Sequence, residues 1–294
     1  MFPALQHDKR KKPFSHFRRP ALIPISHGDV LVDSFVEAAR GAGELALGFF
    51  HPGAMTSAGI SHKAGGSPVT EADYLVDRFL KQRLETLVPE AGWLSEETED
   101  TPARLSKSLV FVVDPIDGTR GFMTGRAAWA IVVALVENGR PLFGIVHAPA
   151  LGKTYVAVKG AGARLNDKAI EVSKLRAIGA QTRVAAPVFL AKRLHESGLR
   201  FNLQPKIPSL ALRIAAVASG ALDAGFASEN SHDWDIAAAD LILHEAGGRL
   251  ASLDGCAIVY NRRDTRHGLL TAAPAQIHAE VNAAARWVNG LAKR

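Results

Sequence analysis

Cysteine is nearly absent from this sequence of 294 residues, which has Cys256 as its single example. One cysteine excludes an intramolecular disulfide framework and a cysteine-rich zinc site, and it favours a reducing compartment. Long apolar runs are also missing, since none approaches the ~20 residues that a membrane span needs. The N-terminus lacks the apolar core of a secretory signal. We therefore expect a cytoplasmic protein with no membrane partner, in which Cys256 is a small packing residue.

Excess basic charge is scarce outside the first residues, although the formal net charge is +6. Residues 1–20 carry six Lys and Arg residues against one Asp, which leaves 29 basic and 28 acidic residues in the remainder. We expect residues 1–27 to be a basic, disordered tail, or the product of a mis-assigned start codon. Binding of nucleic acid through this tail is a weaker hypothesis, because no basic surface interleaved with aromatic residues follows it.

Internal repeats and low-complexity linkers are absent as well, so we expect the parts of the chain to share one rigid body. Apolar spacing predicts helices over 29–50, 72–87, 190–197, 210–219, 236–246 and 274–291. Strands are predicted over 92–95, 109–113, 129–136, 141–148, 153–158, 183–188, 221–227, 249–253 and 269–273, with a surface loop over 51–66. This order predicts an α+β half over residues 28–180 and an α/β half over residues 181–294.

Two carboxylates follow the apolar run 109–113, which predicts a buried strand. The proline between them stops strand pairing and turns the chain, so that Asp114 and Asp117 converge on one point. Carboxylates aimed at one point repel each other unless a proton or a cation lies between them. Gly118 and Thr119 add backbone N–H groups and a hydroxyl, as a phosphate requires. The pattern predicts a divalent metal beside a phosphate cradle, and the alternative is an Asx-type loop cap after a core strand.

Three other acids have both a structural and a functional interpretation. Thr70 and Asp73 have the form of a helix capping box, and Asp73 is equally a carboxylate held rigidly near a helix start. Glu96 belongs to an acidic run that is either a solvated loop or a second source of ligands. If its strand neighbours the strand before Asp114 in one sheet, both carboxylate ends meet at the same edge. Asp235 begins a helix, either as an N-cap or as a buried, positioned carboxylate.

Four fragments, in this order, closely resemble the inositol monophosphatase superfamily over about residues 30–290. They are Pro68-Val69-Thr70-x-x-Asp73, Ser95-Glu96-Glu97, Asp114-Pro115-Ile116-Asp117-Gly118-Thr119 and Trp234-Asp235-x-Ala237-Ala238. The resemblance implies an α+β protein with the layered αβαβα sandwich of the inositol monophosphatase and fructose-1,6-bisphosphatase type. It also implies a magnesium-dependent phosphomonoesterase, often a homodimer. The metal ligands that it implies are Glu96, Asp114, the Ile116 carbonyl, Asp117 and Asp235.

The implied ligands agree with coordination chemistry, because oxygen donors without cysteine or paired histidine spacing select Mg²⁺ before Mn²⁺ and well before Zn²⁺. We expect two or three ions, since a pair about 3.5–4 Å apart that shares a carboxylate serves phosphate-ester hydrolysis. Asp114 is expected to bridge the two ions, and Glu96 is expected to bind the ion that activates the water. Asp117 and Asp235 are expected to bind the ion at the leaving group. The resemblance further implies that Thr119 and Asp73 orient the attacking water and relay its proton. The amides of Gly118 and Thr119 are expected to hold the phosphate.

The expected substrate is a small phosphorylated metabolite, either an inositol monophosphate or a 3′(2′),5′-bisphosphate nucleotide. Glu229 is a candidate for polyol hydroxyls, although it lies one residue nearer Asp235 than the resemblance leads us to expect. Arg213 follows Leu212 much as a lysine follows leucine in the bisphosphate nucleotidases, so it is a candidate for a second phosphate. Arg120 stands where many inositol phosphatases have a second threonine, which weakens the inositol interpretation. The alternatives are histidinol phosphate as substrate and a non-catalytic protein that binds metal or nucleic acid on the same fold.

Overall fold

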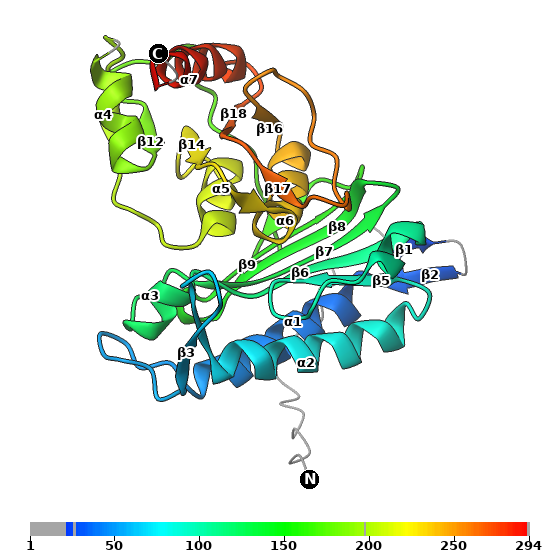
Figure 1. Ribbon diagram of the computed structural model, residues 1–294. Coiled ribbons are helices and arrows are strands. Elements are labelled where there is room, and N and C mark those ends of the chain that lie inside the picture. The colour runs from blue at the N-terminus through cyan, green and yellow to red at the C-terminus, as the bar shows by residue number, and fades with distance from the viewer. Residues whose placement is uncertain (1–21, 26–27, 197, 293–294) are drawn as a thin grey trace.

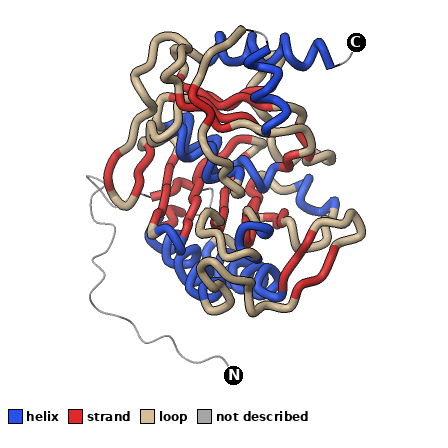
Figure 2. The backbone as a smooth tube through the Cα atoms, turned by 90° about the vertical axis from the view of Figure 1, so that its left-hand side faces the viewer, coloured by secondary structure: helices blue, strands red, loops and turns tan. Residues whose placement is uncertain are grey.

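Helices and sheets alternate in five layers in the computed structural model, which describes residues 22–25, 28–196 and 198–292. A helix pair covers one face of a seven-stranded sheet, a second pair separates this sheet from a five-stranded sheet, and a third pair covers the outer face (Figures 1 and 2). This arrangement confirms the layered αβαβα sandwich that the resemblance implies.

The first layer consists of α1 (Val32–Leu47) and α2 (Glu71–Leu87), which pack against each other and against the seven-stranded sheet. Helix α2 buries Val76, Leu80 and Leu84, which recur every four residues and so form one apolar stripe. Its first turn has the predicted capping box, because the Thr70 N–H donates to Asp73 Oδ2 (2.8 Å) and the Asp73 N–H donates to Thr70 Oγ1 (3.4 Å). The end of the helix that carries Asp73 is thereby fixed.

The seven-stranded sheet consists, in spatial order, of β11 (Lys168–Ala169), β10 (Ala163–Leu165), β9 (Lys153–Val158), β8 (Arg140–Ala148), β7 (Ala130–Glu137), β6 (Leu109–Asp117) and β5 (Gly92–Ser95). All neighbours are antiparallel except β5 and β6, which are parallel. Strand β6 directs Val110 and Val112 towards the second helix pair, and Phe111 and Val113 towards the first. Because both faces are covered, this strand is a continuous apolar run.

The middle layer joins the two halves of the chain. It consists of α5 (Leu210–Ala218) and α6 (Asp233–Glu245), and α6 packs on β6 to β9 of the first sheet and on β16 (Gly248–Ser252) of the second. The second sheet has the order β13 (Asn202–Leu203), β12 (Arg183–Ala185), β14 (Ala224–Ala227), β18 (Leu270–Pro274) and β16. Helices α4 (Val188–Glu196) and α7 (His278–Ala292) form the outer layer.

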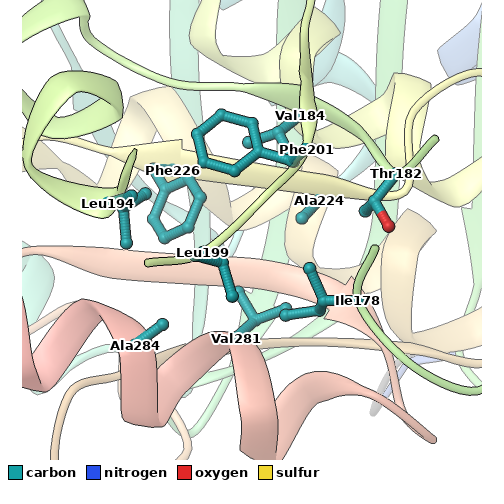
Figure 3. Close-up of a pocket in the computed structure, with 10 residues that line it drawn as sticks. All are labelled: Ile178, Thr182, Val184, Leu194, Leu199, Phe201, Ala224, Phe226, Val281 and Ala284. Atoms are coloured by element: carbon teal, nitrogen blue, oxygen red, sulfur yellow. The ribbon is translucent and has the colours of Figure 1, made fainter. Parts of the chain in front are cut away.

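A small apolar cavity lies between the second sheet and the outer helices (Figure 3). Phe201, Phe226 and Val281 are among its lining side chains, and Thr182 is the only polar residue of the lining. No acid or base lines it, so this cavity is a gap in apolar packing and offers no group for acid–base catalysis or metal binding.

Short strands account for two differences from the predicted elements. Gly28–Leu31 form β2, which pairs with β1 (Leu22–Ile25), so the first helix begins at Val32 and not at residue 29. Ile60–His62 form β3, which pairs with β4 (Pro68–Thr70), so the predicted surface loop 51–66 contains part of a hairpin. Strands this short show too little periodicity to be recognised in sequence.

Three further expectations concern the ends of the chain and its cysteine. Residues 22–25, which the predicted tail 1–27 includes, form β1, and the rest of that range lies outside the described residues. Helix α7 begins at His278 because β18 runs through Pro274. Cys256 is exposed, so its prediction as a packing residue is wrong. Within residues 22–25, 28–196 and 198–292, no helix is both long and apolar enough to cross a membrane.

Gly144 marks a close approach of β8 to α6. A Cβ atom at this position would lie 2.6 Å from the Ala238 carbonyl oxygen and 2.9 Å from its Cα. We expect Gly144→Ala to displace α6 and to lower the free energy of unfolding by about 1–3 kcal/mol. Gly268→Ala is the matched control, because a Cβ there has no atom within 4 Å. Denaturant unfolding measures both, and equal stabilities of the two variants would show that α6 does not depend on this contact.

Candidate active site

Three acids from two elements converge beside the end of β6. One carboxylate oxygen each from Asp114, Asp117 and Asp235 lies within 4.8 Å of the others. The pairing of β6 with β7 is irregular here, since Asp114 pairs with Val132 whereas Asp117 pairs with Ala130. Three steps along β6 match two steps along β7, and this extra residue lets side chains three apart share one side. The predicted turn is therefore a bulge within the strand, and the structure brings these two acids together.

Local donors hold Asp114 and Asp117. The Ile116 N–H donates to Asp114 Oδ1 (3.0 Å), so the Asx-type contact and the convergence of the acids occur together. Asp117 faces the N-terminus of α5, where it accepts the Ser209 hydroxyl and the N–H groups of Leu210 (3.1 Å) and Ala211 (2.7 Å). These donors favour the ionised carboxylate, as does the positive end of the helix dipole.

Asp235 is the third residue of α6, and His232 is the N-cap. The His232 N–H donates to Asp235 Oδ2 (2.6 Å), so Asp235 belongs to a capping box and is not the N-cap itself. Asp233 instead accepts the Asn261 N–H (2.7 Å) and contacts His267 Nε2 (2.7 Å). Asp235 is therefore a positioned carboxylate, as the alternative interpretation predicts, but it is partly exposed and not fully buried.

Burial and mutual repulsion make the ionised form of these three carboxylates unfavourable unless a positive charge lies between them. Burial raises the pKa of Asp114 and of Asp235 well above the usual range, and the neighbouring carboxylates raise it further. Burial raises the pKa of Asp117 to about 6, and the donors of α5 limit that rise. Oxygen ligands in such a cluster fit a hard divalent cation, which would favour the ionised form of all three acids.

Asp73 and Thr119 meet at the edge of this cluster. Thr119, the first residue of α3 (Thr119–Met123), has its Oγ1 3.5 Å from Asp73 Oδ1 and 3.1 Å from the Ile116 carbonyl oxygen. The Thr70 hydroxyl donates to Asp73 Oδ2 (2.5 Å). Burial raises the pKa of Asp73 to about 6. Asp73 thus caps a helix and also faces the hydroxyl of Thr119.

Glu96 follows β5, and its N–H donates to the Val113 carbonyl oxygen of β6 (3.2 Å). The ends of β5 and β6 therefore lie side by side as expected, but Glu96 is not among the three acids whose oxygens lie within 4.8 Å of one another. The side chain of Glu96 contacts Lys63 Nζ (2.9 Å), and so does that of Glu97 (2.8 Å). The charge of Glu96 still contributes to the raised pKa of Asp114. Glu96 thus lies near the three acids and shares a lysine with Glu97.

Gly118 allows the backbone to approach α5. Its φ of 91° lies in the left-handed region, and a Cβ atom would lie 3.1 Å from the Ser209 nitrogen and 3.4 Å from the Ala128 carbonyl oxygen. Only glycine fits such a position without strain. In the described part of the chain, the N–H groups of Gly118 and Thr119 have no acceptor. Two donors are thus available beside the carboxylates.

The two predicted substrate residues lie on the second half of the chain. Arg213 of α5 is half-buried and donates to the carbonyl oxygens of Phe226 (2.8 Å) and Ile207 (3.0 Å). Burial lowers its pKa, and Asp117 is the charge that partly offsets this. Glu229 is exposed, two residues before β15 (Ser231–His232). Arg213 is therefore fixed near the cluster, whereas Glu229 is free to contact solvent.

Three residues that support the site were not predicted from the sequence: Lys63, which contacts Glu96; Ser209, which contacts Asp117; and Asp77, which binds the hydroxyl of Ser95 next to Glu96. Lys63 lies in a loop without periodicity, so no pattern identifies it. Asp77 lies one turn after Asp73 on α2, and this spacing was the available signal. Ser209 precedes a predicted helix, so it was recognisable as an N-cap but not as a donor to Asp117.

A profile of the inositol monophosphatase family matches residues 29–290. The chain belongs to the inositol monophosphatase family. It is 31% identical to the 3′(2′),5′-bisphosphate nucleotidase CysQ of Aggregatibacter actinomycetemcomitans, over 80% of this chain and 89% of that protein. It is 33% identical to a histidinol-phosphatase of Mycobacterium tuberculosis, over 67% of this chain and 79% of that protein. A solved structure of an IMPase from Thermotoga maritima matches 88% of this chain and 98% of its own, with a TM-score of 0.74 and 27% identity.

Membership in the inositol monophosphatase family identifies the protein as a metal-dependent phosphomonoesterase. The names of the similar proteins differ in substrate, since one is a bisphosphate nucleotidase and another a histidinol-phosphatase. Membership in this family therefore leaves the substrate open.

The raised pKa values predict that the metal-free protein loses stability as the pH rises. Burial raises the pKa of Glu97 to about 7 and those of Asp114 and Asp235 well above their usual range, whereas unfolded carboxyls ionise near pH 4. The folded state binds more protons between these values, so the free energy of unfolding falls as the pH rises through them. We expect a lower Tm at pH 8 than at pH 6.5 in EDTA, and a saturating divalent cation should remove most of this difference. Calorimetry that finds a rising Tm in EDTA would contradict the electrostatics described here.

Proposed function

We propose that the protein hydrolyses a small phosphate monoester with Mg²⁺ held by the carboxylate cluster. The observation that carries the proposal is the convergence of the carboxylates of Asp114, Asp117 and Asp235, whose mutual repulsion a cation would relieve. Beside them lie the N–H groups of Gly118 and Thr119, which have no acceptor among the described residues. Family membership supports the reaction class. The oxygen-only donors favour Mg²⁺, with Mn²⁺ as a substitute.

The residues that would hold two or three ions are Glu96, Asp114, Asp117, Asp235 and the carbonyl of Ile116. Asp114 is the shared ligand in this proposal, because Glu96 and Asp117 both contribute to its raised pKa. Bound Mg²⁺ supplies positive charge that lowers the pKa of water and stabilises the leaving oxygen. Glu96 serves the side of the attacking water, and Asp117 with Asp235 serves the side of the leaving group.

Thr119 and Asp73 are proposed to position the attacking water and to take up its proton. In this proposal the water donates to Thr119 Oγ1. The Thr119 hydroxyl, which lies 3.1 Å from the Ile116 carbonyl oxygen and 3.5 Å from Asp73 Oδ1, then donates to Asp73. The proton passes to Asp73 Oδ1. A base with a pKa of about 6 is ionised at neutral pH and still accepts a proton readily.

The N–H groups of Gly118 and Thr119 are proposed to donate to the phosphoryl oxygens. They lie at the start of α3, where the first N–H groups of a helix have no partner within it. The missing side chain at position 118 lets the backbone approach Ser209, the N-cap of the helix that binds Asp117. These fixed donors orient the phosphate without further ordering of the chain.

The leaving group is proposed to contact α5 and the loop before β15. Two nitrogens of Arg213 are engaged with carbonyl oxygens, and its remaining N–H groups suit a second phosphate. The exposed carboxylate of Glu229 suits polyol hydroxyls. A 3′(2′),5′-bisphosphate nucleotide uses the first contact and an inositol monophosphate uses the second. Histidinol phosphate is the alternative, which the similarity to a histidinol-phosphatase supports.

Phosphate release from a panel of substrates tests this proposal. The panel is inositol 1-phosphate, adenosine 3′,5′-bisphosphate, histidinol phosphate and fructose 1,6-bisphosphate, each with Mg²⁺ or EDTA. We expect Mg²⁺-dependent turnover with a preference for one of them. Asp114→Asn should lower turnover by about 100-fold or more, since even partners of metal ligands contribute 10- to 100-fold.

Asp167→Asn is the control for the Asp114 variant, because it makes the same change at an exposed turn. We expect it to retain the activity of the unaltered protein. Turnover of the preferred substrate by Asp114→Asn at the rate of this control would disprove the assignment of the site.

A further inference from the structure

Lys63 joins the hairpin of β3 and β4 to the acidic end of β5. Its Nζ lies 2.9 Å from Glu96 Oε1, 2.8 Å from Glu97 Oε1 and 3.3 Å from the Glu96 carbonyl oxygen. The turn that carries it is closed by bonds from the Lys63 N–H to the Ser67 carbonyl oxygen (2.9 Å) and from the Gly66 N–H to the Lys63 carbonyl oxygen (2.8 Å). One ammonium therefore ties this hairpin to the strand end that carries a proposed cation ligand. The hairpin leads directly into α2 (Figure 1).

The two glutamates that share Lys63 differ in exposure. The side chain of Glu97 is 2% exposed, whereas those of Glu96 and Lys63 are each 25% exposed. Glu97 Oε2 has no hydrogen-bond partner among the described residues. A buried carboxylate that loses its counter-charge is strongly unfavourable, so Glu97 depends on Lys63. Glu96 reaches solvent and is able to exchange the ammonium for another cation.

Hydrogen bonds to Asp77 hold the backbone around Glu97 in place if Glu96 changes its partner. The hydroxyls of Ser95 and Thr98 donate to the two oxygens of Asp77 (2.5 and 2.6 Å), on either side of the glutamate pair. The Glu97 N–H donates in turn to Ser95 Oγ (3.3 Å). Asp77 is buried on α2, so the backbone around both glutamates is fixed to that helix. The partly exposed side chains of Lys63 and Glu96 are not held by these bonds.

We infer that Lys63 is a positioning residue. Its ammonium pairs with the carboxylate of Glu96 until a divalent cation binds there, and it stays paired with the carboxylate of Glu97 throughout. This inference rests on the proposed function, because it takes Glu96 as a cation ligand. The ammonium holds Glu96 in place in the metal-free protein and competes with the cation for its carboxylate. The doubly charged ion repels the ammonium more strongly than Glu96 attracts it, so Lys63 keeps its contact with Glu97 alone.

Calorimetric titration of Mg²⁺ into the whole chain without substrate tests the inference at constant ionic strength. The variants are Lys63→Met, Glu97→Gln, both together, and Lys63→Arg, which keeps the charge. Lys81→Met is the matched control, because it removes a lysine beside Trp93 of β5 that has no carboxylate partner among the described residues. The Tm of each variant in EDTA verifies that it is folded.

We expect Lys63→Met to bind Mg²⁺ at least about tenfold more tightly, because a competing charge near the surface is worth roughly one pKa unit or more. Lys63→Arg and Lys81→Met should remain within about threefold of the unaltered protein. Glu97→Gln should weaken Mg²⁺ binding by about 3- to 10-fold, because Lys63 then pairs with Glu96 alone. In the Lys63→Met background the same change should have less than about a twofold effect, because no competitor remains.

Two results would overturn the inference. One is that Lys63→Met and Lys81→Met change the affinity for Mg²⁺ equally, and the other is that the effects of Lys63→Met and Glu97→Gln simply add in the double variant. Either result would show that Lys63 acts only as a distant positive charge. Should Lys63→Met not fold, Glu97→Gln is compared with Glu71→Gln, which makes the same change at an exposed acid of α2. Weaker Mg²⁺ binding by Glu97→Gln than by Glu71→Gln supports the inference, and equal binding overturns it. The same titration separates failure of this inference from failure of the proposed function, because in the second case the unaltered chain would bind no Mg²⁺ at all.

Discussion

Repulsion among closely spaced carboxylates is the constraint on which the rest of the site depends. Asp114, Asp117 and Asp235 lie close enough that each raises the cost of ionising the others. The fold holds them there through rigid elements: a bulge in a strand buried on both faces, and the N-termini of two helices packed against the sheet. An unsupported loop would relax and separate the charges. A cation that neutralises the cluster is therefore bound by a frame that is already formed, which lowers the entropic cost of binding.

Helix N-termini are the means by which the fold tolerates these acids. Asp73 lies in the first turn of α2, Asp235 lies in the first turn of α6, and Asp117 accepts two N–H groups at the start of α5. Each such donor offsets part of the burial cost and leaves the remaining lone pairs of the carboxylate for other partners. Capping and function are thus not alternatives at these positions, because the hydrogen bonds that cap a helix also fix the direction of the carboxylate.

The sequence identified the parts of this arrangement that depend on neighbouring residues. The apolar run at 109–113 and the acids around it have a local pattern, and so does the end of the strand that carries Glu96. Lys63, Asp77 and Ser209 were missed because their roles depend on partners distant in sequence; Ser209, for example, donates to a residue 92 positions earlier. A single sequence indicates that a lysine or a serine is present, whereas only the packing of layers shows which carboxylate it meets.

A crystal structure with Mn²⁺ in place of Mg²⁺ would test the central claim most directly, because anomalous scattering locates the ions. The account predicts ions coordinated by Asp114, Asp117 and Asp235, with Glu96 as a ligand and Lys63 in contact with Glu97 alone. Ions bound elsewhere, with Asp114, Asp117 and Asp235 still converging without a cation between them, would contradict it.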